Sequence, residues 1–256
     1  IASNRDFAST RNKASPNLVL IVADDLGYGD LGIQGSKQIP TPNIDQLARE
    51  GIIFTNGYVS SPVCAPSRAG LLTGKHQAGF GFNDNLAGNQ PGFDANYLGL
   101  PLTESTLANK LKSLGYATGL IGKWHLGNDN GMAPHEQGFD DSLLMASALY
   151  LPEDDPNTVN AKIPFDPIDK FLWKALTYAN SFNSGDDDRF KPKGYLTDYW
   201  TDESINVIKA NKNRPFFLYL AHWGPHTPLQ ATREDYEAVG DIRPHRKRVY
   251  AAMVRA

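Results

Sequence analysis

The chain has 256 residues, 41% of them hydrophobic, which is enough for one large domain with a buried core. Its formal net charge of −3 excludes a global positive field that would draw it to nucleic acid, and its single cysteine excludes an intramolecular disulfide. No apolar run reaches the length needed to cross a bilayer. Residues 1–15 are polar and begin with Ile rather than Met, which predicts a processed or trimmed N-terminus.

The first predicted element is a strand over residues 17–23, a continuous apolar run rich in β-branched side chains. Such runs are typical of strands buried on both faces of a parallel sheet. Asp24 and Asp25 follow directly, and neighbouring carboxylates repel unless a cation or hydrogen-bond donors lie beside them. The backbone must turn before both can converge, and Gly27 and Gly29 permit such a turn. Taken alone, the pair is better explained as a solvated acidic loop.

A helix is predicted next, over residues 41–51. Thr41 is its expected N-cap, Pro42 suits its first turn, and Gly51 closes it. Residues 52–58 are predicted to be extended and to lead the chain towards the cysteine.

That cysteine, Cys64, is predicted to lie just before a helix over residues 66–73. Free backbone N–H groups at a helix N-terminus favour anions, so this place suits a negatively charged group. Arg68 lies about one turn into the helix and is able to reach back towards residue 64. Most lone cysteines are buried structural residues, so Cys64 by itself indicates little.

Two further elements follow a loop rich in Gly and Asn. Residues 103–114 carry Leu at helical spacing and predict a helix, and residues 116–122 predict a second core strand. Lys123 and His125 come directly after this strand. A Lys and a His two positions apart are more often surface residues than catalysts, but their place at a strand end favours a functional pair.

The segment 128–195 lacks clear periodicity and is rich in Asp, Pro and Asn, which predicts a loop-rich insertion within the domain. Its aromatic residues leave two uses open, a wall that stacks on sugar rings or the more common local mini-core; they are Trp173, Tyr178 and Phe182. The run Asp186-Asp187-Asp188 is interpreted as a solvated loop rather than a calcium site, because its spacing matches no calcium-binding loop.

The last predicted strand covers residues 216–221, after a helix over residues 199–211 that Asp198 is expected to cap. The strand ends close to two histidines. His226 is the candidate functional residue, and His222 is interpreted as a supporting or structural one.

A basic cluster at residues 243–248 precedes a short predicted helix. The favoured interpretation is a solvated helix start, and the alternative is a patch that attracts a polyanionic substrate.

Upstream, three core strands each deliver a polar cluster to their carboxyl end. In a parallel sheet those ends meet at one edge, where ligands bind. The predicted fold class is therefore α/β, with a mostly parallel central sheet flanked by helices.

The most specific motif is C-x-P-S-R at residues 64–68, which leads into a helix of small residues ending in L-T-G. Further motifs are G-K-W-H-L-G at 122–127, H-x-x-P-H-x-P at 222–228, and the stretches 17–32 and 41–51. Together they resemble the type I, formylglycine-dependent sulfatases of the alkaline phosphatase superfamily. The resemblance implies that residues 1–256 are the N-terminal catalytic part of that fold, with its C-terminal part missing.

In that family a cysteine is oxidised to formylglycine by a formylglycine-generating enzyme, and the hydrated aldehyde is the nucleophile. The resemblance implies that this residue is Cys64, and that Asp24, Asp25 and residue 64 bind Ca²⁺ or, alternatively, Mg²⁺. One hydroxyl of the hydrate, ionised on the metal, attacks sulfur and releases the alcohol. The other is then deprotonated and expels sulfate, which regenerates the aldehyde.

The same resemblance assigns the remaining site residues. Arg68 and Lys123 orient the hydrate and offset negative charge. His125 is the candidate base for the second hydroxyl, and His226 contacts sulfate or protonates the leaving oxygen.

One departure from the family concerns the metal. Members supply an Asp-Asn pair and another Lys from a later strand and usually add a small C-terminal antiparallel sheet, none of which lies before Ala256. Calcium takes about six to eight oxygen ligands, more than Asp24, Asp25 and residue 64 offer. Three explanations stay open: a longer protein, a second chain that completes the site, or an inactive fragment. We expect residues 1–256 alone to be poorly soluble, to bind metal weakly and to hydrolyse nothing.

The leading functional hypothesis is hydrolysis of sulfate monoesters, from a sulfated sugar or polysaccharide because of the long polar segment and its aromatic residues. Two alternatives stay open. One is a phosphonate or phosphate ester hydrolase, since related enzymes share C-x-P-S-R, and the other is an inactive glycan-binding relic with unconverted Cys64. The expected partners are the sulfated substrate and the formylglycine-generating enzyme, with no nucleic acid and no membrane. A periplasmic or secreted location is expected.

Overall fold

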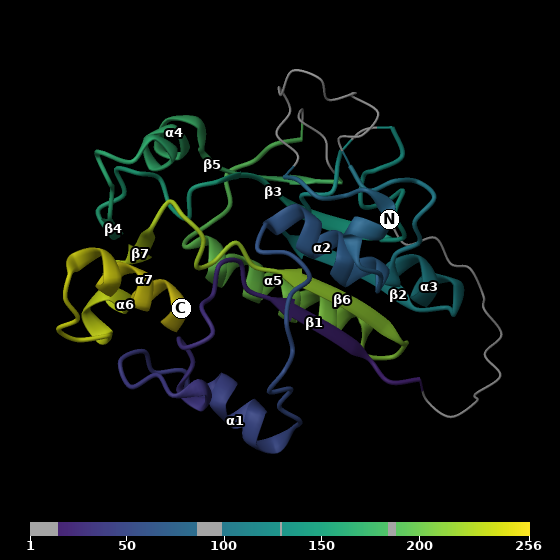
Figure 1. The fold of residues 1–256 in the computed structure, drawn as a ribbon, viewed down its shortest axis with the longest axis horizontal. Coiled ribbons are helices and arrows are strands. Elements are labelled where there is room, and N and C mark those ends of the chain that lie inside the picture. The colour runs from purple at the N-terminus through teal and green to yellow at the C-terminus, as the bar shows by residue number, and fades with distance from the viewer. Residues whose placement is uncertain (1–14, 86–98, 129, 184–187) are drawn as a thin grey trace.

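The computed structural model describes residues 15–85, 99–128, 130–183 and 188–256, and its central element is a five-stranded sheet (Figure 1). The strands lie in the order β1 (Leu18–Val22), β6 (Phe216–Ala221), β2 (Ala117–Gly122), β3 (Asp141–Ala148) and β5 (Tyr178–Phe182). The first four are parallel, and β5 runs antiparallel to β3. This confirms the predicted α/β class with a mostly parallel sheet.

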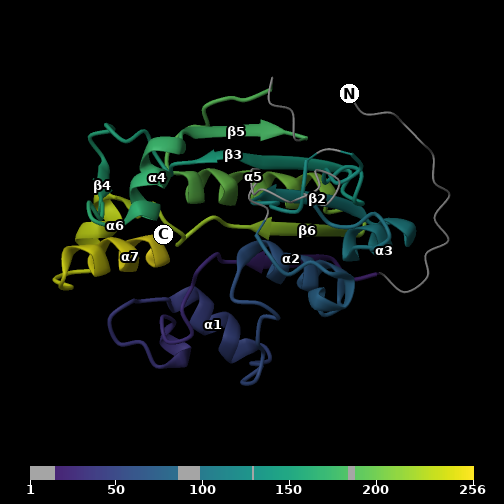
Figure 2. The same ribbon diagram turned by 45° about the horizontal axis from the view of Figure 1, so that its top comes forward.

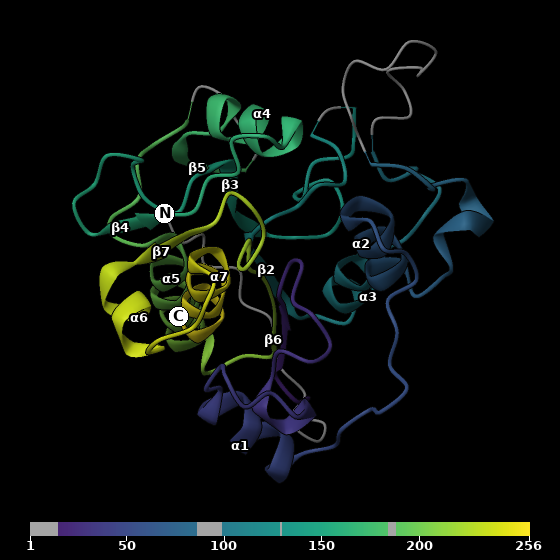
Figure 3. The same cartoon turned by 60° about the vertical axis from the view of Figure 1, so that its left-hand side comes forward.

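Helices cover both faces of this sheet (Figure 3). The helices α2 (Cys64–Thr73) and α3 (Leu107–Ser113) lie on one face, and α5 (Leu196–Asn211) and α7 (His245–Arg255) lie on the other. The central strand β6 shows why. Phe217 and Tyr219 pack on the α2 side, while Leu218 and Leu220 pack on the α5 side. A strand that is apolar at every position can be buried on both faces.

β1 lies at the edge of the sheet, and the prediction that it is buried on both faces is wrong. Among the described strands it pairs with β6 alone, and Ile21 is 61% exposed. The helix α1 (Pro42–Glu50) lies beyond β1, set apart from the sheet, and buries none of its own residues (Figure 2). An apolar run shows how hydrophobic a strand is, but its position in the sheet decides what covers it.

The segment 128–195 holds more regular structure than predicted. It contains β3 and β5, the short strand β4 (Thr158–Asn160) and the helix α4 (Pro167–Ala175). The segment therefore combines loops with regular elements that the sequence pattern did not predict. The pattern missed β3 because this strand mixes Asp, Ser and Ala with apolar residues and lacks the continuous apolar run of β6.

The aromatic residues of this segment divide between two environments. Trp173 and Tyr178 pack with Leu149 in a small buried cluster, which confirms the mini-core interpretation for these two. Phe182 is exposed and stacks on Phe190. Of the three consecutive aspartates expected to form a solvated loop, the first two lie outside the described residues.

Several helices begin earlier or later than predicted. α2 begins at Cys64 rather than at residue 66, because the first N–H groups of a helix have no intrahelical partner and Pro66 is tolerated among them. α5 begins at Leu196, so Asp198 lies in its first turn rather than at its N-cap. α3 begins at Leu107, after a capping box formed by Thr106 and Asn109.

The remaining elements are short. They are the 3₁₀ helices η1 (Gly32–Gln34) and η2 (Gln77–Phe80), the strand β7 (Gln230–Thr232), which pairs with β4, and the helix α6 (Arg233–Ala238). Within the described parts of the chain, no helix is both long and apolar enough to span a membrane.

Candidate active site

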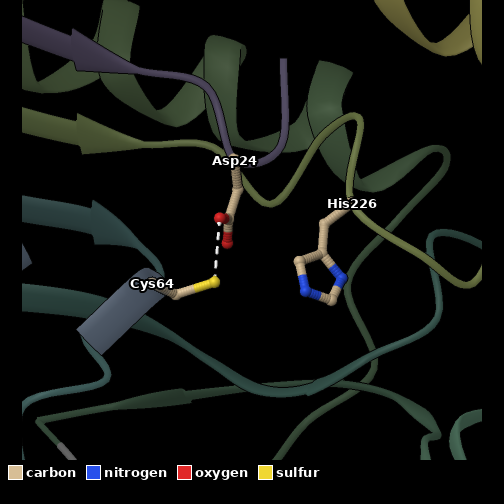
Figure 4. A group of neighbouring side chains, drawn as sticks. All are labelled: Asp24, Cys64 and His226. Carbon is tan, nitrogen blue, oxygen red and sulfur yellow. Dashed lines mark hydrogen bonds between the residues drawn. The ribbon is translucent and has the colours of Figure 1, made fainter. Parts of the chain in front are cut away.

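Four elements meet at the carboxyl edge of the sheet. Asp24 follows β1, Lys123 follows β2, His226 lies shortly after β6, and Cys64 is the first residue of α2. The side chains of Asp24, Cys64 and His226 point toward one another (Figure 4), and one potential ligand atom of each lies within 4.8 Å of the others. Parallel topology thus brings together residues as far apart in the sequence as Asp24 and His226.

Asp24 is the central charge of this site. It is 6% exposed, and its Oδ2 accepts a hydrogen bond from Lys123 Nζ at 2.6 Å and lies 3.3 Å from the Arg68 guanidinium. Burial raises the pKa of Asp24, but the charges of Lys123 and Arg68 outweigh that effect and the pKa lies below its ordinary value. The carboxylate is therefore ionised, with two cations to compensate its burial.

The Cys64 thiol lies beside this carboxylate, with 3.4 Å between Sγ and Oδ1 of Asp24. Burial raises the pKa of the Cys64 thiol; the Lys123 ammonium opposes the rise, and the Asp24 carboxylate adds to it. The thiol is therefore neutral at physiological pH. Since nucleophilic attack by sulfur requires the thiolate, unmodified Cys64 is a poor nucleophile here.

Arg68 is buried and links α2 to three strands. Its guanidinium donates to the backbone carbonyl of Lys123 at 2.9 Å and to the Tyr219 hydroxyl at 3.1 Å, in addition to the pairing with Asp24. The sequence predicted that Arg68 could reach back towards residue 64. In the structure its guanidinium pairs with the Asp24 carboxylate, which itself contacts Cys64. The planar guanidinium suits this role because it presents several donors in fixed directions.

His125 lies two residues after Lys123, in a left-handed backbone conformation with φ of 59°. Burial and, next, the charges of Lys123 and Arg68 lower the pKa of His125 from 6.5 to about 3. The imidazole is therefore neutral at physiological pH and able to accept a proton. A pKa of about 3 makes it a weak base, and a nearby negative charge such as bound sulfate would strengthen it.

His226 presents its Nε2 atom to the site. Its Nδ1 lies 2.5 Å from the carbonyl oxygen of Thr227, and because a carbonyl only accepts, Nδ1 carries a proton. Nε2 lies 3.5 Å from Oδ2 of Asp25. Burial and the Lys123 charge lower the pKa of His226, which favours the neutral ring, so a lone pair faces a carboxylate oxygen. Two acceptors at that distance favour a cation or a proton donor between them.

Asp25 turns the chain so that both carboxylates reach the site. It adopts a left-handed conformation with φ of 65°, and its carboxylate is 55% exposed. Gly27 and Gly29, which were expected to permit the turn, do not take the left-handed conformation; Asp25 itself takes it, and Asp tolerates it better than most residues do. Tyr250 of α7 holds the turn, since its hydroxyl contacts Asp30 Oδ2 at 2.5 Å.

The residues around the site offer the type of ligand that a hard divalent cation prefers, but too few of them to complete its coordination. The carboxylate oxygens of Asp24 and Asp25 are ligands that such a cation prefers. The group that could hold a metal by geometry alone consists of Asp24, Cys64 and His226, so it includes a histidine that the sequence assigned to sulfate and leaves out Asp25. Two carboxylates fall short of the six to eight oxygen ligands, roughly, that calcium takes.

Sequence reasoning missed two tyrosines that support the site. Tyr219 of β6 holds the Arg68 guanidinium, and Tyr150 is fully buried and donates its hydroxyl hydrogen bond to the backbone carbonyl of His226 at 2.8 Å. The alternation of faces along β6 could have placed Tyr219 towards α2, but no pattern in the sequence indicates the contact of Tyr150. His222, interpreted from the sequence as a supporting or structural residue, has its ring against that of Trp200.

The basic cluster 243–248 takes part in contacts between elements. His245 contacts Tyr236 and the backbone of Asn160, and Arg248 stacks on the ring of Tyr236. These contacts support the interpretation of the cluster as the start of a helix, α7, over the interpretation as a polyanion-binding patch.

The chain matches the family model described as Sulfatase over residues 16–255. N-acetylgalactosamine-6-sulfatase of Mus musculus is 33% identical over 223 residues, which are 86% of this chain and 41% of that protein. Arylsulfatase J of Mus musculus is 34% identical over an alignment of 258 positions, which covers 98% of this chain and 39% of that protein. The chain thus spans about two fifths of the length of these relatives.

Solved structures agree with these relatives. The crystal structure of Ps i-CgsB is 36% identical and superposes with a TM-score of 0.76, covering 94% of this chain and 52% of that one. A second structure of that protein is a complex with k-i-k-neocarrahexaose. The family match covers nearly all of the described fold and each of the residues at its carboxyl edge. The chain therefore belongs to the sulfatase family.

Proposed function

We propose that this protein hydrolyses sulfate monoesters of sulfated sugars. The observation that carries the proposal is the convergence of Cys64, Asp24, Lys123 and His226 at one edge of the sheet, beside the N-terminus of α2. Two cations, a helix N-terminus and a histidine suit an anionic ester whose charge builds up as its bond breaks. The sulfatase relatives and the oligosaccharide complex of Ps i-CgsB support the sugar part of the proposal.

The nucleophile that we propose is formylglycine, formed from Cys64 by a formylglycine-generating enzyme. The raised pKa of the thiol supports it, because unmodified sulfur at this position is protonated and weakly nucleophilic. Once converted and hydrated, residue 64 would supply one hydroxyl to attack sulfur and a second one whose deprotonation releases sulfate.

Ca²⁺ or Mg²⁺ is the proposed metal, and Asp24, Asp25 and the converted residue 64 are its proposed ligands. The acceptor pair formed by Asp25 Oδ2 and His226 Nε2 supports a cation at this place. A bound ion would polarise the sulfuryl oxygens and favour the ionised form of the attacking hydroxyl. We propose that its further ligands come from outside the described residues.

The other residues act on the charge and the protons of the reaction. Lys123 and Arg68 stabilise negative charge around residue 64, and both are already fixed by Asp24. His125 is neutral and accepts the proton of the second hydroxyl. His226 faces the site with Nε2, and this nitrogen contacts sulfate or protonates the leaving oxygen once it has itself taken up a proton.

Three measurements on the full-length protein test the proposal. Hydrolysis of 4-nitrophenyl sulfate should exceed that of 4-nitrophenyl phosphate, and Cys64→Ala should abolish it while the circular dichroism spectrum stays unchanged. Preferential turnover of the phosphate would favour the alternative of a phosphate or phosphonate ester hydrolase. Intact mass tests the third hypothesis, because a protein whose Cys64 keeps its thiol has not been converted to formylglycine and lacks the proposed nucleophile.

A further inference from the structure

Trp223 lies behind the site, between the end of β6 and His226, and the function proposed above assigns it no role. It is 5% exposed and packs within the core on the α5 side of the sheet. Its indole ring contacts two of the site residues at once. The ring of His226 stacks on it with 3.8 Å between centroids and 27° between planes, and Lys123 Nζ lies 4.4 Å from its centroid.

These two contacts restrict different kinds of motion. Lys123 ends in a compact ammonium on a flexible four-carbon stem. Without restraint, many of its rotamers would place the ammonium away from the site. An aromatic face attracts that ammonium at this distance, while Asp24 Oδ2 holds it from another side at 2.6 Å. The stacked indole fixes the plane of the His226 ring, and the bond of Nδ1 to Thr227 fixes its rotation. Together these contacts set where the ammonium and Nε2 point.

A merely structural role explains Trp223 less well. Its Nε1 is buried and has no hydrogen-bond partner among the described residues, which is a cost that a phenylalanine or a leucine would not carry. The indole also offers the strongest cation–π face of the aromatic side chains. The aromatic face of Trp223 therefore accounts for a tryptophan at this position, and neither its N–H group nor its apolar volume alone does so.

We propose that Trp223 is a positioning residue that holds the Lys123 ammonium and the His226 imidazole in their reactive orientation. The reactive part of this statement rests on the proposed function, whereas the positioning part does not. Lys123 follows β2 and His226 follows β6, and one ring just after the end of β6 sets them relative to each other. Misplacement of such groups by about 1 Å can cost on the order of 100-fold in rate.

The test compares two variants of the full-length protein. Trp223→Met keeps much of the apolar volume without a ring, and Trp223→Phe keeps a smaller ring. We expect Trp223→Met to lower kcat for 4-nitrophenyl sulfate by about 10- to 100-fold with KM changed less than about 3-fold, and Trp223→Phe to recover most of kcat. The matched control is Trp173→Met, because Trp173 also lies under a lysine, Lys162 at 4.8 Å, but away from the site. It should leave kcat unchanged.

A second readout needs no activity. In protein labelled at its histidines with ¹³C, the Cε1–H resonance of His226, assigned with His226→Gln, should lie upfield because the indole ring current shields it. Trp223→Met should move it towards the position of a free histidine, Trp223→Phe only partway, and Trp173→Met should not move it. An unmoved resonance in Trp223→Met, or in Trp223→Phe if the Met variant does not fold, would overturn the proposal.

The two readouts keep this proposal separate from the proposed function. A wild-type protein that hydrolyses no aryl sulfate contradicts the function, while the His226 resonance still decides the positioning. A wild-type protein that is active, together with a Trp223→Met variant of equal kcat, contradicts the role of Trp223 and leaves the function standing.

Discussion

Asp24 carries a negative charge where water is largely excluded, and two cations from different elements neutralise it. Lys123 and Arg68 are themselves buried, so each charge of the trio depends on the others. Asp25, the next residue, has an exposed carboxylate and only a long contact with His226. Two adjacent residues of the same type therefore have different energetic roles.

This difference predicts unequal effects of the same substitution. Asp24→Asn leaves two buried cations without their counter-charge and should lower the free energy of unfolding by about 3–5 kcal/mol. Asp25→Asn removes an exposed charge and should change it by less than about 1 kcal/mol. Urea unfolding of both variants, followed by circular dichroism, measures the two values.

Activity should not follow this ranking. If both carboxylates bind the metal, each variant loses sulfate ester hydrolysis in the full-length protein, and any residual turnover loses its sensitivity to chelators. Wild-type activity and chelator sensitivity in both variants would remove Asp24 and Asp25 from the metal site. Equal loss of stability in both would contradict the burial argument.

At the scale of the elements, the ends of β2 and β6 set the position of Lys123. Gly122, the last residue of β2, has φ of 105°, and a Cβ built on it would lie 2.1 Å from the carbonyl oxygen of Ala221 in β6. The two strands approach so closely there that a side chain does not fit. The hydrogen bond from the Lys123 backbone N–H to the same carbonyl, at 2.8 Å, continues the pairing past the strand end.

Gly122→Ala should therefore separate the strand ends and displace Lys123. We expect it to lower the free energy of unfolding by at least about 2 kcal/mol, from the left-handed backbone and the overlap together. The control is Gly119→Ala in the same strand, where a Cβ meets only side-chain atoms at 3.8 Å. It should change stability by less than about 1 kcal/mol. Similar thermal unfolding of the two variants would show that the close approach at Gly122 is not a constraint.

At the scale of the whole molecule, one side presents apolar surface to solvent. The edge strand β1 and residues 52–58, which follow α1, expose large hydrophobic side chains, among them Val19, Ile21, Ile52, Phe54 and Tyr58. β1 also carries unpaired backbone groups along its outer edge, since β6 is its one partner among the described strands. An exposed apolar edge of this kind favours association with other chains.

We expect the 256-residue chain, purified by itself, to self-associate through this side. Ile21→Lys and Phe54→Lys introduce charges on the exposed edge and the exposed segment and should shift the chain towards monomer in light scattering after size-exclusion chromatography. Leu102→Lys, at an exposed apolar residue outside these two segments, is the control and should not shift it. A monomeric wild-type chain at the same concentration would contradict the expectation.

The sequence by itself determined which residues have polar chemistry at strand ends, and it identified β6 as a core strand. The run 216–221 is apolar at every position, and this alone predicts a central strand buried on both faces. Asp24, Lys123 and His226 each come after a predicted strand, so a parallel topology requires that they lie at one edge of the sheet. The motif around Cys64 carried the family resemblance, which the family match confirms.

The tertiary structure decided the place of each strand in the sheet and the contacts between distant residues, which local sequence patterns do not contain. β1 is as apolar as a central strand but lies at the edge, because burial depends on which elements pack against it. β3 joins the central sheet with a mixed sequence, because its neighbours rather than its own hydrophobicity define its environment. The pairing of Arg68 with Asp24 and the contact of Trp223 with Lys123 link residues far apart in the chain. Such contacts depend on distances in space, which only the packing of the elements sets.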